Sequence, residues 1–139
     1  MGVFADITVV DDSGTVIVLA EPPGKIVSLS PHLTELLFSL GAGDRIKATV
    51  EFSDYPEAAL KIPRLGNAFS VSVEAVIEQS PDLIVAWMTG GNQRTIEQLR
   101  SLSYPVFVNE ASSLGGIAAA VKQLGTLVGK PERGLELAK

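Results

Sequence analysis

The stretch that most constrains the fold runs from Lys25 to Gly43 and reads KIVSLSPHLTELLFSLGAG. Its opening run of apolar residues, IVSL, is typical of a strand that is covered on both faces. Ser30 then offers a helix N-cap and Pro31 suits the first helical position, while leucines follow at the spacing of one helix face. Gly41 suits the left-handed residue that ends a helix. The stretch therefore predicts a buried strand, a tight turn and an amphipathic helix.

The turn of this unit, Ser30-Pro31-His32, follows the carboxyl end of the predicted strand. In an open α/β sheet, ligands bind in the crevice beyond the carboxyl ends of the strands. The turn is therefore a candidate binding site, although an ordinary strand–helix connection would have the same sequence pattern.

Strand and helix patterns alternate along the rest of the chain. Runs rich in β-branched residues at 7–10 and 15–19, joined by DDSG, predict an N-terminal hairpin. Further strands are predicted at residues 26–29, 45–50, 83–86 and 105–108, and helices after Ser72, after Asn92, after Ser112 or Ser113, and from Pro131 onward. This alternation predicts βαβ units and hence an α/β fold: an open, mostly parallel sheet with helices on both faces.

Apolar spacing also predicts which side chains of the later helices face the core. Leu99 and Leu102 fall on one face of the helix after residue 92, and Ile117 and Leu124 fall on one face of the next helix. The last predicted helix is still running at Lys139, which suggests that a longer protein continues beyond this sequence.

Composition narrows the class of function. The chain has 139 residues, of which 46% are hydrophobic and 19% are charged, so one globular domain with a real core is expected. The formal net charge of −5 argues against nucleic-acid binding, which needs a basic surface. The absence of cysteine excludes disulfides, thiolate metal sites and a cysteine nucleophile. No apolar run is long enough for a transmembrane helix.

Motifs for catalysis and metal binding are weak. Ile46 stands where a dinucleotide fingerprint needs its third glycine, and neither a P-loop nor a G-x-S-x-G elbow is present. His32 is the only histidine, so a small α/β enzyme would use it with a carboxylate, for example in a Ser-His-Asp triad. A metal site built from His32, Glu35 and Asp54 is an alternative, but transition-metal sites usually have two or more His or Cys ligands. We therefore expect no tight metal site and no cofactor.

Aromatic residues are predicted to gather at the same edge of the sheet as the turn. Trp87 follows the most apolar strand, LIVA, and precedes a polar loop, and a core tryptophan is the alternative. Phe52 and Tyr55 lie in the loop after the second strand of the sheet, and Phe69 lies in a later loop. At the carboxyl edge of a parallel sheet these side chains would face the ligand crevice. Such a set favours a large, flat, partly apolar ligand over a phosphate or a sugar.

Four segments, read in order, carry a resemblance to a known family. They are KIVSLSPHLTELLFSLGAGDRI, EFSDYPEAALKIPRLG, SVEAVIEQSPDLIVAW and LRSLSYPVFV. In this order they resemble the N-terminal lobe of periplasmic substrate-binding proteins of the vitamin B12 and iron-siderophore ABC importers. The resemblance runs from about Phe4 to Lys139, and the SDYP and PDLIVAW pieces are most similar to the cobalamin-binding branch.

The resemblance implies a protein without catalysis, whose two lobes are joined by one long helix and close over a ligand. This chain would belong to an importer component that captures cobalamin, a corrinoid, and delivers it to a membrane permease. The alternatives are an iron-siderophore or haem binder of the same family and, from other classes, a small α/β enzyme or a standalone interaction module. The ligand-binding residues implied by the resemblance are Ser30, Pro31, His32, Phe52, Asn67, Ala68, Phe69 and Trp87.

The resemblance also implies how the chain is divided and where it works. Residues 1–24 would form the hairpin and a linker, 25–129 the N-terminal lobe, and 130–139 the truncated start of the interlobe helix. The location would be periplasmic, or extracytoplasmic on a lipid anchor, with a signal peptide that is absent from this sequence. No nucleic-acid partner is expected. A single lobe would leave an apolar patch uncovered, so a homodimer is expected at high concentration.

Overall fold

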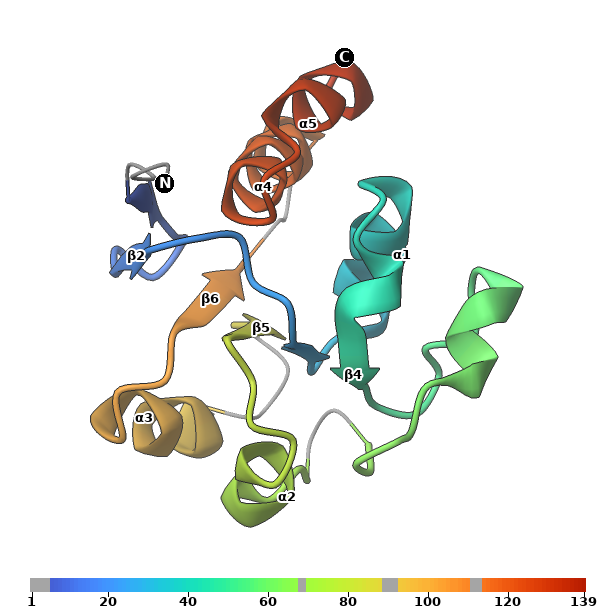
Figure 1. Ribbon diagram of the computed structural model, residues 1–139, viewed down its shortest axis with the longest axis vertical. Helices are drawn as coiled ribbons and strands as arrows, with labels where there is room; N and C mark the ends of the chain where they lie inside the picture. Colours follow the sequence, from blue (N-terminus) through green and yellow to red (C-terminus); the bar gives the residue numbers. More distant parts are fainter. Residues whose placement is uncertain (1–5, 68–69, 89–92, 111–113) are drawn as a thin grey trace, which may run out of the picture.

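A computed structural model describes residues 6–67, 70–88, 93–110 and 114–139, and its centre is a four-stranded parallel sheet (Figure 1). The strands lie in the order β4-β3-β5-β6. Their bounds are Ile26–Ser28 for β3, Ile46–Ala48 for β4, Leu83–Trp87 for β5 and Val106–Asn109 for β6. All three strand pairs are parallel, which confirms the predicted open α/β sheet and places β3 and β5 at its centre.

Helices cover both faces of this sheet, as predicted (Figure 1). The helices on one face are α1 (Pro31–Ser39), α4 (Leu114–Leu127) and α5 (Pro131–Leu137), and those on the other face are α2 (Val73–Ile77) and α3 (Gln93–Ser101). Two short 3-10 helices, η1 (Gly43–Arg45) and η2 (Glu57–Lys61), complete the connections. In the part of the chain that the structure describes, none of the helices has both the length and the apolar character needed to cross a membrane.

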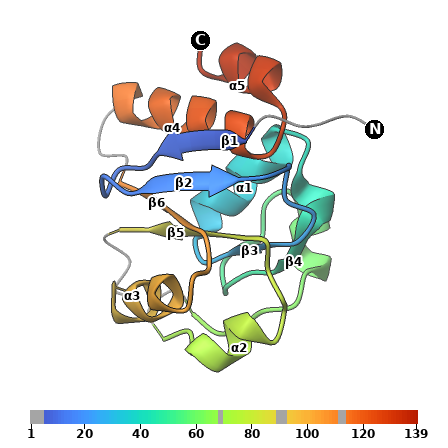
Figure 2. The same cartoon turned by 60° about the vertical axis from the view of Figure 1, so that its left-hand side comes forward.

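The N-terminal hairpin pairs β1 (Ile7–Val10) with β2 (Val16–Leu19) in antiparallel register, as predicted. It lies beside α4, at the β6 edge of the sheet (Figure 1 and Figure 2), and its inward side chains Val9, Ile17 and Leu19 join the same core as those of α1 and α4. The backbone N–H of Asp12, in the hairpin turn, donates to the carbonyl of Val108 at 3.1 Å. The hairpin is therefore anchored on β6 at its turn as well as packed through its strands.

Alternating side chains of the strands contribute to two separate cores. Phe107 of β6 packs in the cluster that contains α1 and α4, whereas Val106 and Val108 pack in the cluster that contains α2 and α3. The same alternation separates Leu83 from Ile84 on β5. Both faces of the sheet are buried, which explains why these strands read as continuous apolar runs.

The predicted helix caps are confirmed where the structure describes them. Ser30 and Ser72 cap α1 and α2, and each side-chain oxygen accepts the backbone N–H three residues on, at 3.5 and 3.1 Å. Gly41 follows α1 with a φ of 83°, the left-handed conformation expected of it. The caps predicted at Asn92 and at 112–113 lie outside the described residues.

Two predictions about the helices are wrong. Leu102 is 54% exposed, because α3 ends at Ser101 and the chain turns away from the buried helix face. Ile117 is 44% exposed, because the first part of α4 borders an open groove beside α1. The last helix, α5, spans Pro131–Leu137, and the Ala138 N–H still donates to the Gly134 carbonyl at 3.0 Å.

Candidate functional site

Strands β3, β5 and β6 bring polar and aromatic residues into one row at their carboxyl ends. In register, Ser28 pairs with Val85 and Trp87 pairs with Asn109, so Ser30, Trp87 and Asn109 lie side by side. We call this edge of the sheet the rim. Sequence patterns did not single out Asn109, because the predicted strand ended one residue before it. The available signal was a polar residue closing an apolar strand, at the same edge that marked Trp87.

His32 connects the two ends of this row. Its Nδ1 lies 2.7 Å from the Ser30 Oγ, and its Nε2 lies 3.0 Å from the Asn109 Oδ1. Pro31, between Ser30 and His32, opens α1. The Asn109 amide nitrogen donates to the carboxylate of Asp12 at 3.0 Å, so the chain of hydrogen bonds reaches the hairpin turn. Asn109 is fully buried, which shields the middle of this chain from water.

Trp87 stands beside His32 at the rim. The two ring centroids are 5.5 Å apart and the ring planes meet at 84°, which is an edge-to-face contact. Trp87 is 38% exposed, whereas the four strand residues before it are buried. It is therefore not a core residue, and part of it is open to solvent.

Phe52 occupies a second part of the rim, beyond β4. It is 78% exposed and has a φ of 70°, a left-handed conformation that is strained for an aromatic residue. The carbonyls of Val50 and Ser53, on either side of it, accept from the Arg64 guanidinium at 3.2 and 2.8 Å. The Ser53 hydroxyl also accepts from the buried hydroxyl of Thr49 at 2.9 Å. Hydrogen bonds from Arg64 and Thr49 thus hold the loop, while the Phe52 ring stays exposed.

Asn67 lies on the same side of the sheet as Phe52. The segment before it runs parallel to the end of β4, through a bridge between Thr49 and Arg64. Asn67 follows this segment and so lies at the same edge as the rim. Two further predicted site residues, Ala68 and Phe69, lie outside the described residues. The structure therefore brings Ser30, His32 and Trp87 together, and places Phe52 and Asn67 beyond them on the far side of β3.

The pair of Ser30 and His32 resembles part of a catalytic triad, but its surroundings do not suit a nucleophile. Ser30 is fully buried and its hydroxyl caps α1. A nucleophile must reach its substrate, and a hydroxyl on a residue with no exposed surface cannot do so. The Ser30 hydroxyl is therefore not placed to attack a substrate. Among the described residues, no group of three or more histidine, aspartate or glutamate side chains lies close enough to hold a metal ion.

A groove of about 270 Å³ opens beside His32, between α1 and α4. Its lining residues are His32, Glu35, Leu36, Ser39, Asn109, Ile117 and Ala120. The groove shares His32 and Asn109 with the rim, so it continues the rim toward the helix layer.

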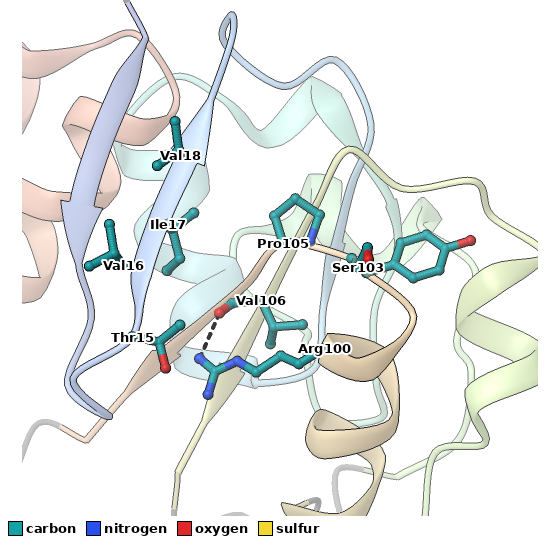
Figure 3. A pocket seen from close by; sticks show the side chains of 9 residues that line it. Thr15, Val16, Ile17, Val18, Arg100, Ser103, Pro105 and Val106 are labelled. Carbon is teal, nitrogen blue, oxygen red and sulfur yellow. Dashed lines mark hydrogen bonds between the residues drawn. The ribbon is translucent and has the colours of Figure 1, made fainter.

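A second cavity, of about 300 Å³, lies at the amino end of β6, between β2 and the turn that follows α3 (Figure 3). Arg100 crosses it and donates to the Val106 carbonyl at 2.9 Å, the bond dashed in Figure 3. The same guanidinium donates at 2.7 Å to the buried carboxylate of Asp11, which also accepts the Val108 N–H at 2.8 Å. The charge of Arg100 is paired inside the protein, so these contacts attach the hairpin to β6 and do not form part of the rim.

Fold and rim together define a class of protein: an α/β lobe with polar and aromatic residues gathered at the carboxyl ends of its parallel strands, the edge where ligands bind in such sheets. Comparison with known proteins identifies the family. Residues 26–139 match the family model described as periplasmic binding protein. The chain belongs to the periplasmic binding protein family, which confirms the resemblance found in the sequence.

Individual relatives are longer than this chain. The chain is 37% identical over 117 residues to a vitamin B12-binding protein of Vibrio campbellii, a match that covers 84% of this chain and 42% of that protein. It superposes on the periplasmic vitamin B12 binding protein BtuF of Vibrio cholerae with a TM-score of 0.79 and 35% identity, covering 84% of this chain and 46% of the other. It also superposes on the periplasmic heme-binding protein RhuT of Roseiflexus sp. RS-1 with a TM-score of 0.76 and 28% identity, covering 82% and 44%. The chain therefore spans less than half the length of each of these relatives.

Proposed function

We propose that this chain is the N-terminal lobe of a substrate-binding protein that captures cobalamin and delivers it to an ABC permease in the membrane. The observation that carries this function is the pair of His32 and Trp87 at the rim, which lies inside the family match at residues 26–139. A supported, partly exposed indole suits a large, flat, partly apolar ligand such as a corrin ring. The likeness to the vitamin B12-binding proteins of Vibrio campbellii and Vibrio cholerae supports cobalamin as that ligand.

The rim would bind by contact and perform no catalysis. Trp87 and Phe52 would supply exposed aromatic area, and Asn67 would add a polar contact at the same edge. The Ser30 hydroxyl and both nitrogens of His32 are engaged inside the protein, so they would keep the aromatic surface in place. This division of roles is typical of a site that recognises shape and apolar surface.

Haem or an iron-siderophore is the second candidate, and the likeness to the heme-binding protein RhuT supports it. Haem iron takes an axial ligand such as a histidine nitrogen or a tyrosine oxygen. Binding through His32 would break one of its two hydrogen bonds, so the exposed phenol of Tyr55 is the better placed iron ligand on this lobe. Cobalamin binding by apolar contact would need neither a broken His32 hydrogen bond nor an iron ligand from Tyr55, and we therefore favour cobalamin.

Location and partners follow from the same function. The protein would act in the periplasm, or outside the cytoplasmic membrane on a lipid anchor. Its partners would be the ligand, the permease and a second lobe that covers the other side of the ligand. The division into a hairpin at 1–24, a lobe at 25–129 and an interlobe helix from 130 stays a prediction, as does the homodimer.

Titration of the 139-residue chain with cyanocobalamin tests this function. Trp87 is the only tryptophan, so its indole N–H signal in NMR reports on the rim alone. We expect cobalamin to move this signal with weak affinity, because one lobe covers only one side of the ligand. A signal that stays in place at millimolar cobalamin would contradict the proposed ligand.

Haemin and a ferric siderophore, titrated in the same way, separate the two candidates. A response to haemin that is lost in Tyr55→Phe, together with no response to cobalamin, would replace the first candidate with the second. Leu102→Ala is the control for both titrations, because Leu102 is exposed and follows α3, away from the rim. We expect it to leave every response unchanged.

A further inference from the structure

We infer that Asp12 and Asn109 are positioning residues of the rim: they hold His32, and through it Trp87, in the orientation that meets the ligand. This role deepens the proposed function and rests on it, since it concerns the surface that would bind cobalamin. It assigns part of the ligand site to the N-terminal hairpin, which no sequence pattern connects to that site.

The first step is the orientation of the Asn109 side chain. Asp12 Oδ2 accepts from the Asn109 amide nitrogen at 3.0 Å and from the Glu110 backbone N–H at 2.6 Å. An ionised carboxylate can only accept hydrogen bonds. The Asn109 amide nitrogen must therefore face Asp12, and its oxygen must face His32.

The second step is the state of the His32 ring. The Asn109 Oδ1 is an acceptor, so the hydrogen between it and His32, at 3.0 Å, belongs to Nε2. In the neutral ring the other nitrogen, Nδ1, then accepts the hydroxyl hydrogen of Ser30 at 2.7 Å. With both nitrogens held, the imidazole has one tautomer and one plane.

The third step carries this orientation to Trp87. The edge-to-face contact with His32, at 5.5 Å between centroids, depends on the angle between the two rings. Trp87 and Asn109 are also partners in the β5–β6 register, and the Met88 N–H donates to the Asn109 carbonyl at 2.8 Å. Asn109 therefore fixes the indole from two sides, through its backbone and through His32.

The hairpin turn lies where Asp12 can hold Asn109, and through it His32 and Trp87. The turn between β1 and β2 lies at the same side of the molecule as the carboxyl end of β5 (Figure 2). Asp11, the residue before Asp12, is buried, and its carboxylate accepts hydrogen bonds from the Val108 N–H at 2.8 Å and from the Arg100 guanidinium at 2.7 Å. This anchor keeps Asp12 within reach of Asn109, although 97 residues separate them in the chain.

The test uses the 139-residue chain, in which one histidine and one tryptophan give unambiguous NMR signals. Asp12→Ala removes the acceptor from an exposed turn residue, and Asp12→Asn restores an acceptor oxygen. Asp44→Ala, at an exposed aspartate in η1, is the matched control. Three quantities are measured for each chain. The imidazole ¹⁵N shifts report the tautomer of His32, the indole N–H signal reports the environment of Trp87, and calorimetry gives the dissociation constant for cyanocobalamin.

We expect the native chain and Asp44→Ala to show the Nε2–H tautomer, and Asp12→Ala to show a mixture of tautomers with a displaced indole signal. The dissociation constant should rise about threefold to tenfold in Asp12→Ala, the size expected for a lost aromatic orientation, and fall back in Asp12→Asn. Imidazole and indole signals that do not respond to Asp12→Ala would overturn the inference. So would an unchanged dissociation constant in a chain that binds cobalamin.

The ligand and the positioning role can fail separately. If the imidazole and indole signals respond as expected but the native chain does not bind cobalamin, the coupling of hairpin to rim stands and the proposed ligand is wrong. If the native chain binds cobalamin and the signals do not respond, the ligand stands and the positioning role is wrong.

Discussion

Trp87 is the residue whose proposed role separates most clearly from folding. Because it is 38% exposed, Trp87→Ala removes ligand contact but little core packing. We expect the dissociation constant for cobalamin to rise about tenfold or more, as for an aromatic anchor, while the free energy of unfolding falls by less than about 2 kcal/mol. Calorimetry and urea denaturation measure the two quantities.

Leu99→Ala is the opposite case, because Leu99 is fully buried on α3. It should lower the free energy of unfolding by about 2–5 kcal/mol and leave the affinity of the folded chain unchanged. If Trp87→Ala were the more destabilising change and left cobalamin affinity intact, Trp87 would be a structural residue.

Thr49 is the residue that supports the Phe52 loop. Its hydroxyl lies 2.9 Å from those of both Thr34 and Ser53, and all three residues are buried. Thr49→Val keeps the shape but leaves these two hydroxyls short of a partner, so the free energy of unfolding should fall by about 1–3 kcal/mol. The same substitution at Thr126, whose hydroxyl only bonds back to its own helix, should change it by less than about 0.5 kcal/mol. Equal effects at both positions in urea denaturation would show that the cluster does not support the loop.

At the scale of elements, the sequence was sufficient wherever a short pattern decides the structure. The hairpin, the strand predicted at 83–86 and the helix that follows Ser30 each carry a local pattern of apolar residues and turn or cap residues, and each is confirmed. Leu102 and Ile117 were assigned wrongly because helix periodicity does not say where a helix ends or which part of it overhangs the sheet. Those two facts depend on the neighbouring elements.

The candidate site could also be predicted only as far as local sequence patterns reach. Trp87 and the turn of Ser30 and His32 could be placed at one edge, because parallel strands align their carboxyl ends. Asn109 and Asp12 could not be connected to them, because their contacts depend on strand register and on how the hairpin docks. The ligand-binding role of all these residues remains a prediction.

Helices α4 and α5 pack closely through glycines. A Cβ built at Gly134 would lie 3.0 Å from the Val121 carbonyl oxygen and 3.3 Å from the Gly125 Cα. Gly134→Leu should force the helices apart and lower the free energy of unfolding by about 1–3 kcal/mol, as overpacking does. Ala119→Leu, at an exposed position of α4, is the control and should have little effect. A Gly134→Leu chain as stable as the control in thermal unfolding would mean that α5 is loosely attached.

In the proposed function, the whole molecule would present one side of a binding site. Phe52, Tyr55 and Trp87 are exposed aromatic residues at the rim or in its loops, and such surfaces tend to find a partner. We therefore expect a homodimer at high concentration, with two-fold symmetry as the default. Sedimentation equilibrium should then show a mass that rises from 14.6 kDa toward twice that value. A constant monomer mass over the whole concentration range would contradict this expectation.

The central claim is that this chain binds cobalamin as half of a two-lobe site. Losing the second lobe would expose about 200 Å² of apolar ligand surface, which at about 25 cal/mol per Å² is about 5 kcal/mol, or more than about a thousandfold in affinity. The most direct measurement is calorimetry of cyanocobalamin binding to the chain alone and to a chimera that joins it to the second lobe of the Vibrio cholerae protein. We predict weak binding by the chain, tight binding by the chimera, and a loss of affinity in the chimera on Trp87→Ala. Submicromolar binding by the chain alone, or a chimera whose affinity does not depend on Trp87, would contradict the claim.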